Sequence, residues 1–147
     1  MLLRKPPSRL ETYNDADGEV VNFFRVVRDR PEDLVRAIAL TPWARAEYEL
    51  TFEPVPENHP DPELERARRF FARAWMSMGG GATARWRTGW RYHVRPQSTT
   101  TTERWSKLEH LYAVAERLRL VQIEQGDVLE VIRRYDTPEM LFYLDPP

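Results

Sequence analysis

The sequence predicts an α/β protein with a parallel sheet, and three observations lead to this fold class. Short strand candidates alternate with helix candidates near both ends of the chain, as in consecutive βαβ units. A proline-rich segment and a long loop interrupt this alternation in the middle, which predicts an insertion. The apolar run 141–144 then stops at an acid and two prolines. Such a run is typical of a buried strand, and proline must end it.

The first part of the chain predicts one strand and two helices. Residues 10–13 form a strand candidate that ends at Asn14 and Asp15. Residues 16–28 follow as a helix with Asp17 as a plausible N-cap, and its apolar positions fall on one face. Pro31 suits the first turn of another helix that runs to about residue 40.

The middle of the chain predicts one long helix and an extended loop. Residues 53–62 carry four prolines and must be irregular. Residues 62–76 show an apolar stripe at helical spacing, and the glycines at 79–81 end this helix. From there to residue 102 we expect a loop that includes a serine-threonine run.

Regular structure returns after residue 103. Apolar residues keep helical spacing over 105–118, a strand candidate covers 120–123, and a helix covers 128–135. The run 141–144 is the final strand candidate. We therefore expect two parts of one domain, 1–52 and 104–147, on either side of an inserted region, 53–103.

Composition excludes several classes of function. The chain has 147 residues, 41% of them hydrophobic, and no cysteine. It can bury a core of its own, and disulfides, zinc–thiolate sites and cysteine nucleophiles are excluded. The three histidines show no metal-ligand spacing, so we expect no metal. We see no membrane span or secretion signal and expect a soluble, cytoplasmic protein.

The net charge of −1 hides a strong asymmetry. Residues 66–95 contain eight arginines and no acid, while the rest of the chain has 14 basic and 23 acidic residues. A local basic block is the usual electrostatic footprint for a polyanion.

Within this block, the loop 82–95 alternates arginines with aromatic residues. Arginine pairs with phosphate or guanine, and aromatic rings stack on bases. The alternative is an ordinary solvated face. The candidate DNA-binding residues are Arg85, Trp86, Arg87, Trp90, Arg91, Tyr92 and Arg95.

Three strand candidates are followed by an acid: Asp15, Asp127 and Asp145. Asp15 and Asp127 each stand before a helix, so either could simply cap it. However, the carboxyl ends of parallel strands lie on one edge of a sheet, where open α/β proteins bind ligands. The coincidence predicts a single pocket.

These residues, in this order, resemble the Dam-like family of adenine-specific DNA methyltransferases. The resemblance is carried by residues 13–25, 40–43, Trp105 with 118–127, and 142–147, and the first and last of these are the most specific. It implies a Rossmann-like fold that uses S-adenosylmethionine, with residues 53–103 in the position of a mainly helical target-recognition region. It also implies double-stranded DNA as the partner.

The resemblance assigns a role to each acid. Asp15 would bind the ribose of the cofactor, and Asp127 would lie beside its adenine. Asp145, with Pro146 and Pro147, matches the start of the catalytic motif. Its carboxylate and the carbonyl of Pro146 would accept the two amine hydrogens of a target adenine flipped out of the duplex.

The chain also departs from the family. The glycine-rich cofactor loop, a further glycine-lysine motif and the tyrosine after Pro147 are missing. We therefore expect a parallel sheet that lacks its first strand, and a chain that is inactive alone or complemented by another methyltransferase fragment. The alternatives are a DNA-binding remnant without activity, and a plain α/β domain whose loop binds a protein. The sequence does not determine the DNA target.

Overall fold

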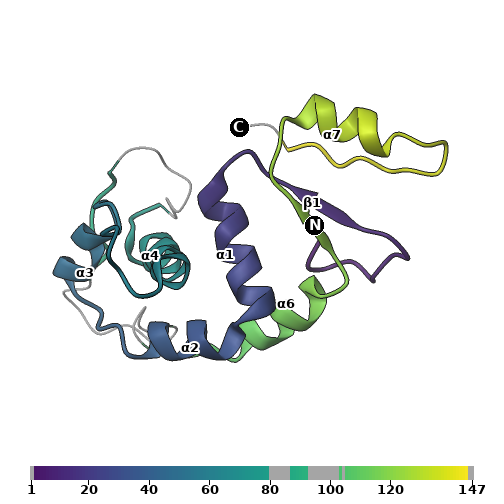
Figure 1. Ribbon diagram of the computed structural model, residues 1–147. Coiled ribbons are helices and arrows are strands. Elements are labelled where there is room, and N and C mark those ends of the chain that lie inside the picture. The colour runs from purple at the N-terminus through teal and green to yellow at the C-terminus, as the bar shows by residue number, and fades with distance from the viewer. Residues whose placement is uncertain (1, 80–86, 93–102, 104, 146–147) are drawn as a thin grey trace.

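A computed structural model describes residues 2–79, 87–92, 103 and 105–145 of the chain. Within these residues the protein is a mixed α/β structure with a two-stranded parallel sheet and six helices (Figure 1). The sheet lies at one end, and most of the helices extend away from it. The elements are β1 (Thr12–Asn14), α1 (Gly18–Asp29), α2 (Pro31–Ala39), α3 (Arg45–Leu50), α4 (Pro62–Met76), α6 (His110–Leu118), β2 (Gln122–Glu124) and α7 (Val128–Tyr135).

The sheet joins two segments that are far apart in the sequence. β1 pairs with β2 in parallel, with Thr12 opposite Gln122 and Asn14 opposite Glu124. A side-chain hydrogen bond of 3.1 Å from Thr12 Oγ1 to Gln122 Oε1 reinforces the pairing. Each strand is followed directly by a helix, α1 after β1 and α7 after β2. The predicted parallel pairing and the strand–helix order are thus confirmed.

Three of the helices have an aspartate at the N-cap position. Asp17 accepts a hydrogen bond from the Glu19 amide at the start of α1, as its predicted N-cap role requires. Asp61 does the same for α4, whose first residue is a proline with no amide hydrogen to satisfy. Asp127 caps α7. These helix starts are therefore determined locally.

α1 is the central helix of the core, and both α4 and α6 pack against it. Phe23 of α1 lies against Phe70 and Phe71 of α4, at ring-centroid distances of 5.1 and 6.1 Å. α4 belongs to the stretch that the sequence predicts as an insertion, yet it shares one hydrophobic core with α1 and α6. The division at residues 53 and 103 stays a prediction.

The structure differs from the expected elements at several places. Both strands begin two residues later than expected, and the helix expected over 105–118 is continuous only from His110. α3 was not predicted, because six residues with few apolar positions give no clear periodicity. The predicted final strand, 141–144, is wrong: the segment is not a strand, and Leu141 is 82% exposed. A strand needs a neighbour to receive its backbone hydrogen bonds. Among the described residues, β1 and β2 pair only with each other.

The end of α4 shows why glycine occurs there. Gly79 has a φ of 83°, a left-handed conformation that glycine adopts without steric cost. The turn lets the amide of Met78 donate a 2.8 Å hydrogen bond to the carbonyl of Gly89. The predicted serine-threonine run lies outside the described residues. Of the helices described, none combines the length and apolar character needed to cross a membrane.

Candidate functional site

Two of the three predicted strand-end acids lie together at the carboxyl edge of the sheet. Asp15 and Asp127 each follow the end of a paired strand, β1 and β2 respectively. The amide of Asp15 donates to the carbonyl of Glu124 at 3.4 Å, and Asn14 Nδ2 donates to the carbonyl of Gly126 at 3.1 Å. The two turns that carry the acids are thus joined directly.

The carboxylate of Asp15 is held in place by two donors. One oxygen accepts the phenolic hydrogen of Tyr13 at 2.8 Å, and the other accepts the amide of Asp17 at 2.9 Å. Burial and this hydrogen bond to Asp15 raise the pKa of Tyr13 well above its ordinary value. Tyr13 therefore stays neutral and keeps donating. Asp17 is the cap of α1, which leaves Asp15 free of that structural role.

Asp127 is the N-cap of α7, a structural role that the sequence allowed as one alternative. Its Oδ1 accepts the amides of Leu129 and Glu130, at 2.9 and 3.2 Å, and so caps α7. Its Oδ2 has no hydrogen-bond partner within the described part of the chain. Capping therefore leaves one carboxylate oxygen available to a ligand.

Sequence reasoning missed the residues that fit the two turns together. Asn14 bridges to the carbonyl of Gly126, and the side-chain amide of Gln125 lies against Gly18 at the start of α1. A Cβ placed on Gly18 would come within 2.9 Å of Gln125 Nε2. Both contacts connect positions more than a hundred residues apart, so no local sequence pattern could predict them.

The third predicted strand-end acid, Asp145, does not follow a strand. It follows the exposed segment 141–144, which has no strand partner among the described residues, and its own side chain is exposed. Figure 1 shows this segment after α7, turning back toward the sheet. Asp145 makes no hydrogen bond or ion pair with the described residues. Pro146 and Pro147 lie outside them.

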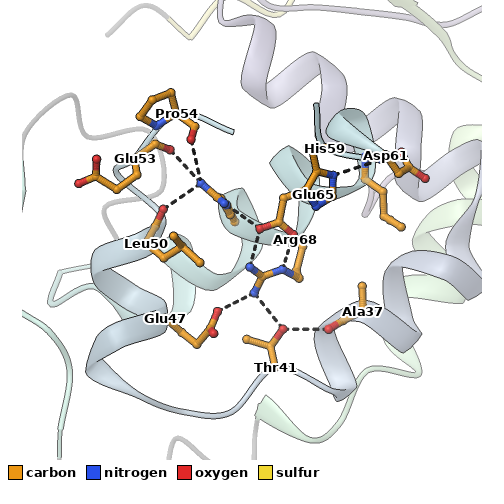
Figure 2. A network of polar contacts seen from close by, with 12 residues as sticks. Ala37, Thr41, Glu47, Leu50, Glu53, Pro54, His59, Asp61, Glu65 and Arg68 are labelled. Carbon is orange, nitrogen blue, oxygen red and sulfur yellow. Dashed lines mark hydrogen bonds and ion pairs between the residues drawn. The ribbon is translucent and has the colours of Figure 1, made fainter. Parts of the chain in front are cut away.

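The arginines of α4 are occupied by internal contacts (Figure 2). Arg68 forms ion pairs with Glu65 at 2.7 Å and with Glu47 of α3 at 2.9 Å. Arg69, only 7% exposed, pairs with Glu65 at 2.6 Å. Burial alone would raise the pKa of Glu65, but the hydrogen bonds from both arginines hold it below its ordinary value. The network thus joins α4 to α3.

Other members of the basic block are occupied as well. Arg66 lies 3.7 Å from the carboxylate of Glu19, and the guanidinium of Arg73 lies over the ring of Phe52. Arg87, a predicted DNA contact, pairs with Glu49 at 2.6 Å and stacks on Phe52. The count of eight arginines therefore overstates the free positive charge, because the partner acids lie outside residues 66–95.

The backbone of residues 88–91 is held by contacts from three directions. The amide of Arg91 donates to the carbonyl of Met76 at 2.6 Å. Trp43 Nε1 donates to the carbonyl of Arg91 at 3.2 Å, and the hydroxyl of Tyr48 donates to the carbonyl of Thr88. These hydrogen bonds therefore fix the backbone that carries Trp90, Arg91 and Tyr92. Arg85, Trp86 and Arg95 lie outside the described residues.

The described residues contain no group of three or more histidine, aspartate or glutamate side chains that could hold a metal ion. Comparison of the chain with protein-family models, curated proteins and solved structures finds no match. The function must therefore be argued from the arrangement of the residues.

Proposed function

We propose that this chain is part of a site-specific DNA adenine methyltransferase with a Rossmann-like core, which uses S-adenosylmethionine. One observation carries the proposal: the turns that carry Asp15 and Asp127, the two residues with implied cofactor roles, are joined at the carboxyl edge of a parallel strand pair. This edge is where open α/β sheets bind nucleotide-like ligands.

The carboxylate oxygens of the two acids still have free hydrogen-bond acceptor positions that suit the cofactor. Each carboxylate oxygen can accept two hydrogen bonds, so Asp15 keeps free lone pairs for a ribose diol beside those used by Tyr13 and Asp17. The unpaired Oδ2 of Asp127 can accept a hydrogen bond from an adenine amine. Both positions therefore accept the hydrogen bonds that the nucleoside part of S-adenosylmethionine donates.

Asp145 is the proposed group for the target base. When bound, the cofactor supplies a methyl group activated on a sulfonium. The carboxylate of Asp145 would accept one hydrogen of the adenine amine and the carbonyl of Pro146 the other, which directs the nitrogen lone pair toward the methyl. This role consists of alignment and electrostatic stabilisation. Asp145 has no competing partner among the described residues.

Transfer of labelled methyl to adenine in duplex DNA tests the proposal. We would assay the chain alone and the chain joined to a glycine-rich cofactor segment and a tyrosine-containing tail. We expect activity in the joined protein that is lost on Asp145→Ala and kept on Glu139→Ala, a nearby exposed acid with no partner in the described structure. A folded joined protein that never methylates DNA would contradict the proposal. A protein that binds DNA without methylating it would favour the DNA-binding remnant.

A further inference from the structure

One arginine outside the predicted DNA-binding loop belongs to the same surface as that loop. The guanidinium carbon of Arg45, the first residue of α3, lies 4.8 Å from the centre of the Trp90 ring. Trp90 in turn stacks on Tyr92, with ring centroids 5.8 Å apart and an interplanar angle of 20°. We call Arg45, Trp90, Arg91 and Tyr92 the Arg45 surface.

The Arg45 surface carries positive charge that no internal acid neutralises. Neither Arg45 nor Arg91 forms an ion pair with any described residue, unlike Arg66, Arg68, Arg69 and Arg87. The two acids of α3 are committed elsewhere, Glu47 to Arg68 and Glu49 to Arg87. The stretches 80–86 and 93–102, which lie on either side of residues 87–92 in the sequence, contain no acid at all.

Contacts within the protein also hold the Arg45 surface in a fixed orientation. Hydrogen bonds hold the backbone on either side of Trp90: Met78 donates to the carbonyl of Gly89, while Arg91 donates to α4 and accepts from Trp43. A guanidinium that lies over a tryptophan face is attracted by the ring and restricted in its rotation. Its N–H donors lie in its own plane, so they stay free at the edge for a bidentate contact. Such a fork matches the two free oxygens of a phosphodiester.

We propose that Arg45 contacts a phosphate of the DNA backbone and that Trp90 holds its guanidinium in position for this contact. Tyr92, 58% exposed, offers an aromatic surface beside it. The combination of unpaired arginines and two stacked rings, of which Tyr92 is exposed, is that of a nucleic-acid surface. The inference rests on DNA as the substrate in the proposed function, but it does not require methyl transfer.

The salt dependence of DNA binding tests this contact. We would measure the affinity of the full chain for a mixed-sequence duplex, without cofactor, for the unmodified protein and for Arg45→Ala, Arg45→Lys and Arg36→Ala. Arg36 is a matched control, an exposed arginine of α2 with no ion pair to the described residues. Urea unfolding would confirm that all four proteins are folded.

Loss of one phosphate contact lowers the slope of log affinity against log salt by about 0.9. We therefore expect Arg45→Ala to reduce the affinity loss between about 50 and 200 mM salt by about threefold. Arg45→Lys should recover the slope but bind more weakly, because lysine lacks the fork. Arg36→Ala should bind as the unmodified chain does.

Two results would overturn the inference: an Arg45→Ala slope equal to that of the unmodified protein, or an equal loss in Arg36→Ala. An unmodified chain that binds no DNA would overturn it too. Failure of the inference is separable from failure of the proposed function. Methyl transfer that persists with an unchanged Arg45→Ala slope removes only the Arg45 contact. An Arg45-dependent slope in a protein that never methylates DNA removes only the methyltransferase.

Discussion

The indole Nε1 of Trp43 donates a hydrogen bond to the backbone carbonyl of Arg91, 3.2 Å away and 48 residues later in the chain. Trp43 also packs edge-on against Trp105, whose own indole donates to the carbonyl of Thr41 at 3.3 Å. Trp43 thus ties the segment after α2 to the residues around Trp90, and Trp105 supports Trp43 from the other side of that segment. The position of the Arg45 surface depends on side chains far from it in sequence.

Replacing Trp43 with phenylalanine should loosen this attachment. The change removes the hydrogen bond to Arg91 and leaves its part-buried carbonyl without that donor, which costs up to about 1–3 kcal/mol. We expect a lower free energy of unfolding in urea together with weaker DNA binding. Tyr112→Phe is the control, because that tyrosine is exposed and its hydroxyl has no partner among the described residues. Equal stability of the two variants would show that the Trp43 hydrogen bond is unimportant.

Replacing Arg69 tests whether the ion-pair network between α3 and α4 stabilises the fold. Arg69 pairs with Glu65 and donates to the carbonyls of Leu50 and Glu53, at 3.2 and 3.0 Å, near the end of α3. Arg69→Ala removes the side-chain donor of the Glu53 carbonyl and one partner of Glu65, and breaking a buried pair costs roughly 3–5 kcal/mol. Urea denaturation should report a loss of this order, against a change within about 0.5 kcal/mol for exposed Arg36→Ala. A loss no larger than that of Arg36→Ala would mean that the network does not stabilise the fold.

Local features of the fold could be predicted from the sequence, whereas the ion-pair partners of the arginines could not. Caps and turns are local, so the caps Asp17 and Asp127 could be predicted from the sequence, and the bounds predicted for α4 and α7 match the structure. The partners of arginines are not local. A count of charge over residues 66–95 cannot include Glu47 or Glu49, which lie on another helix.

Non-local pairing also limits what the sequence predicts about the sheet. Its two strands could be predicted because each precedes a capped helix and ends in an acid. The apolar run 141–144 has strand composition, but composition cannot supply a neighbouring strand to pair with it. The strands before Asp15 and Asp127 could therefore be predicted from the sequence, whereas the strand predicted before Asp145 is wrong.

Glu11 should make stability depend on pH. Its side chain is nearly buried, and it pairs with Lys5 and, at 2.6 Å, with Arg117 of α6. The hydrogen bond from Lys5 is the main cause that lowers the pKa of Glu11, against burial, which raises it; Arg117 lowers it further. Because the folded-state pKa is depressed, the stabilisation is full above the unfolded-state value of about 4.3. It is lost as the pH falls through the folded-state pKa.

A comparison with Glu11→Gln isolates this contribution from those of other carboxylates. The difference in free energy of unfolding between the two proteins should be largest near neutral pH and should shrink as the pH falls below about 4.3. Urea denaturation at a series of pH values would measure it. A difference that stays constant over this range would show that the ion pairs of Glu11 do not contribute.

Asp127 allows its structural and its proposed cofactor role to be separated. Asparagine caps a helix about as well as aspartate, whereas alanine loses about 1 kcal/mol. In Asp127→Asn the side-chain carbonyl can replace Oδ1 as acceptor for Leu129 and Glu130, while an amide that donates replaces the unpaired Oδ2. Stability should therefore be kept in Asp127→Asn and reduced in Asp127→Ala. Binding of S-adenosylmethionine by the joined protein, measured calorimetrically, should fall in both, because an amide donor cannot accept from the adenine amine. Unchanged binding in Asp127→Asn would leave Asp127 with the cap of α7 as its role.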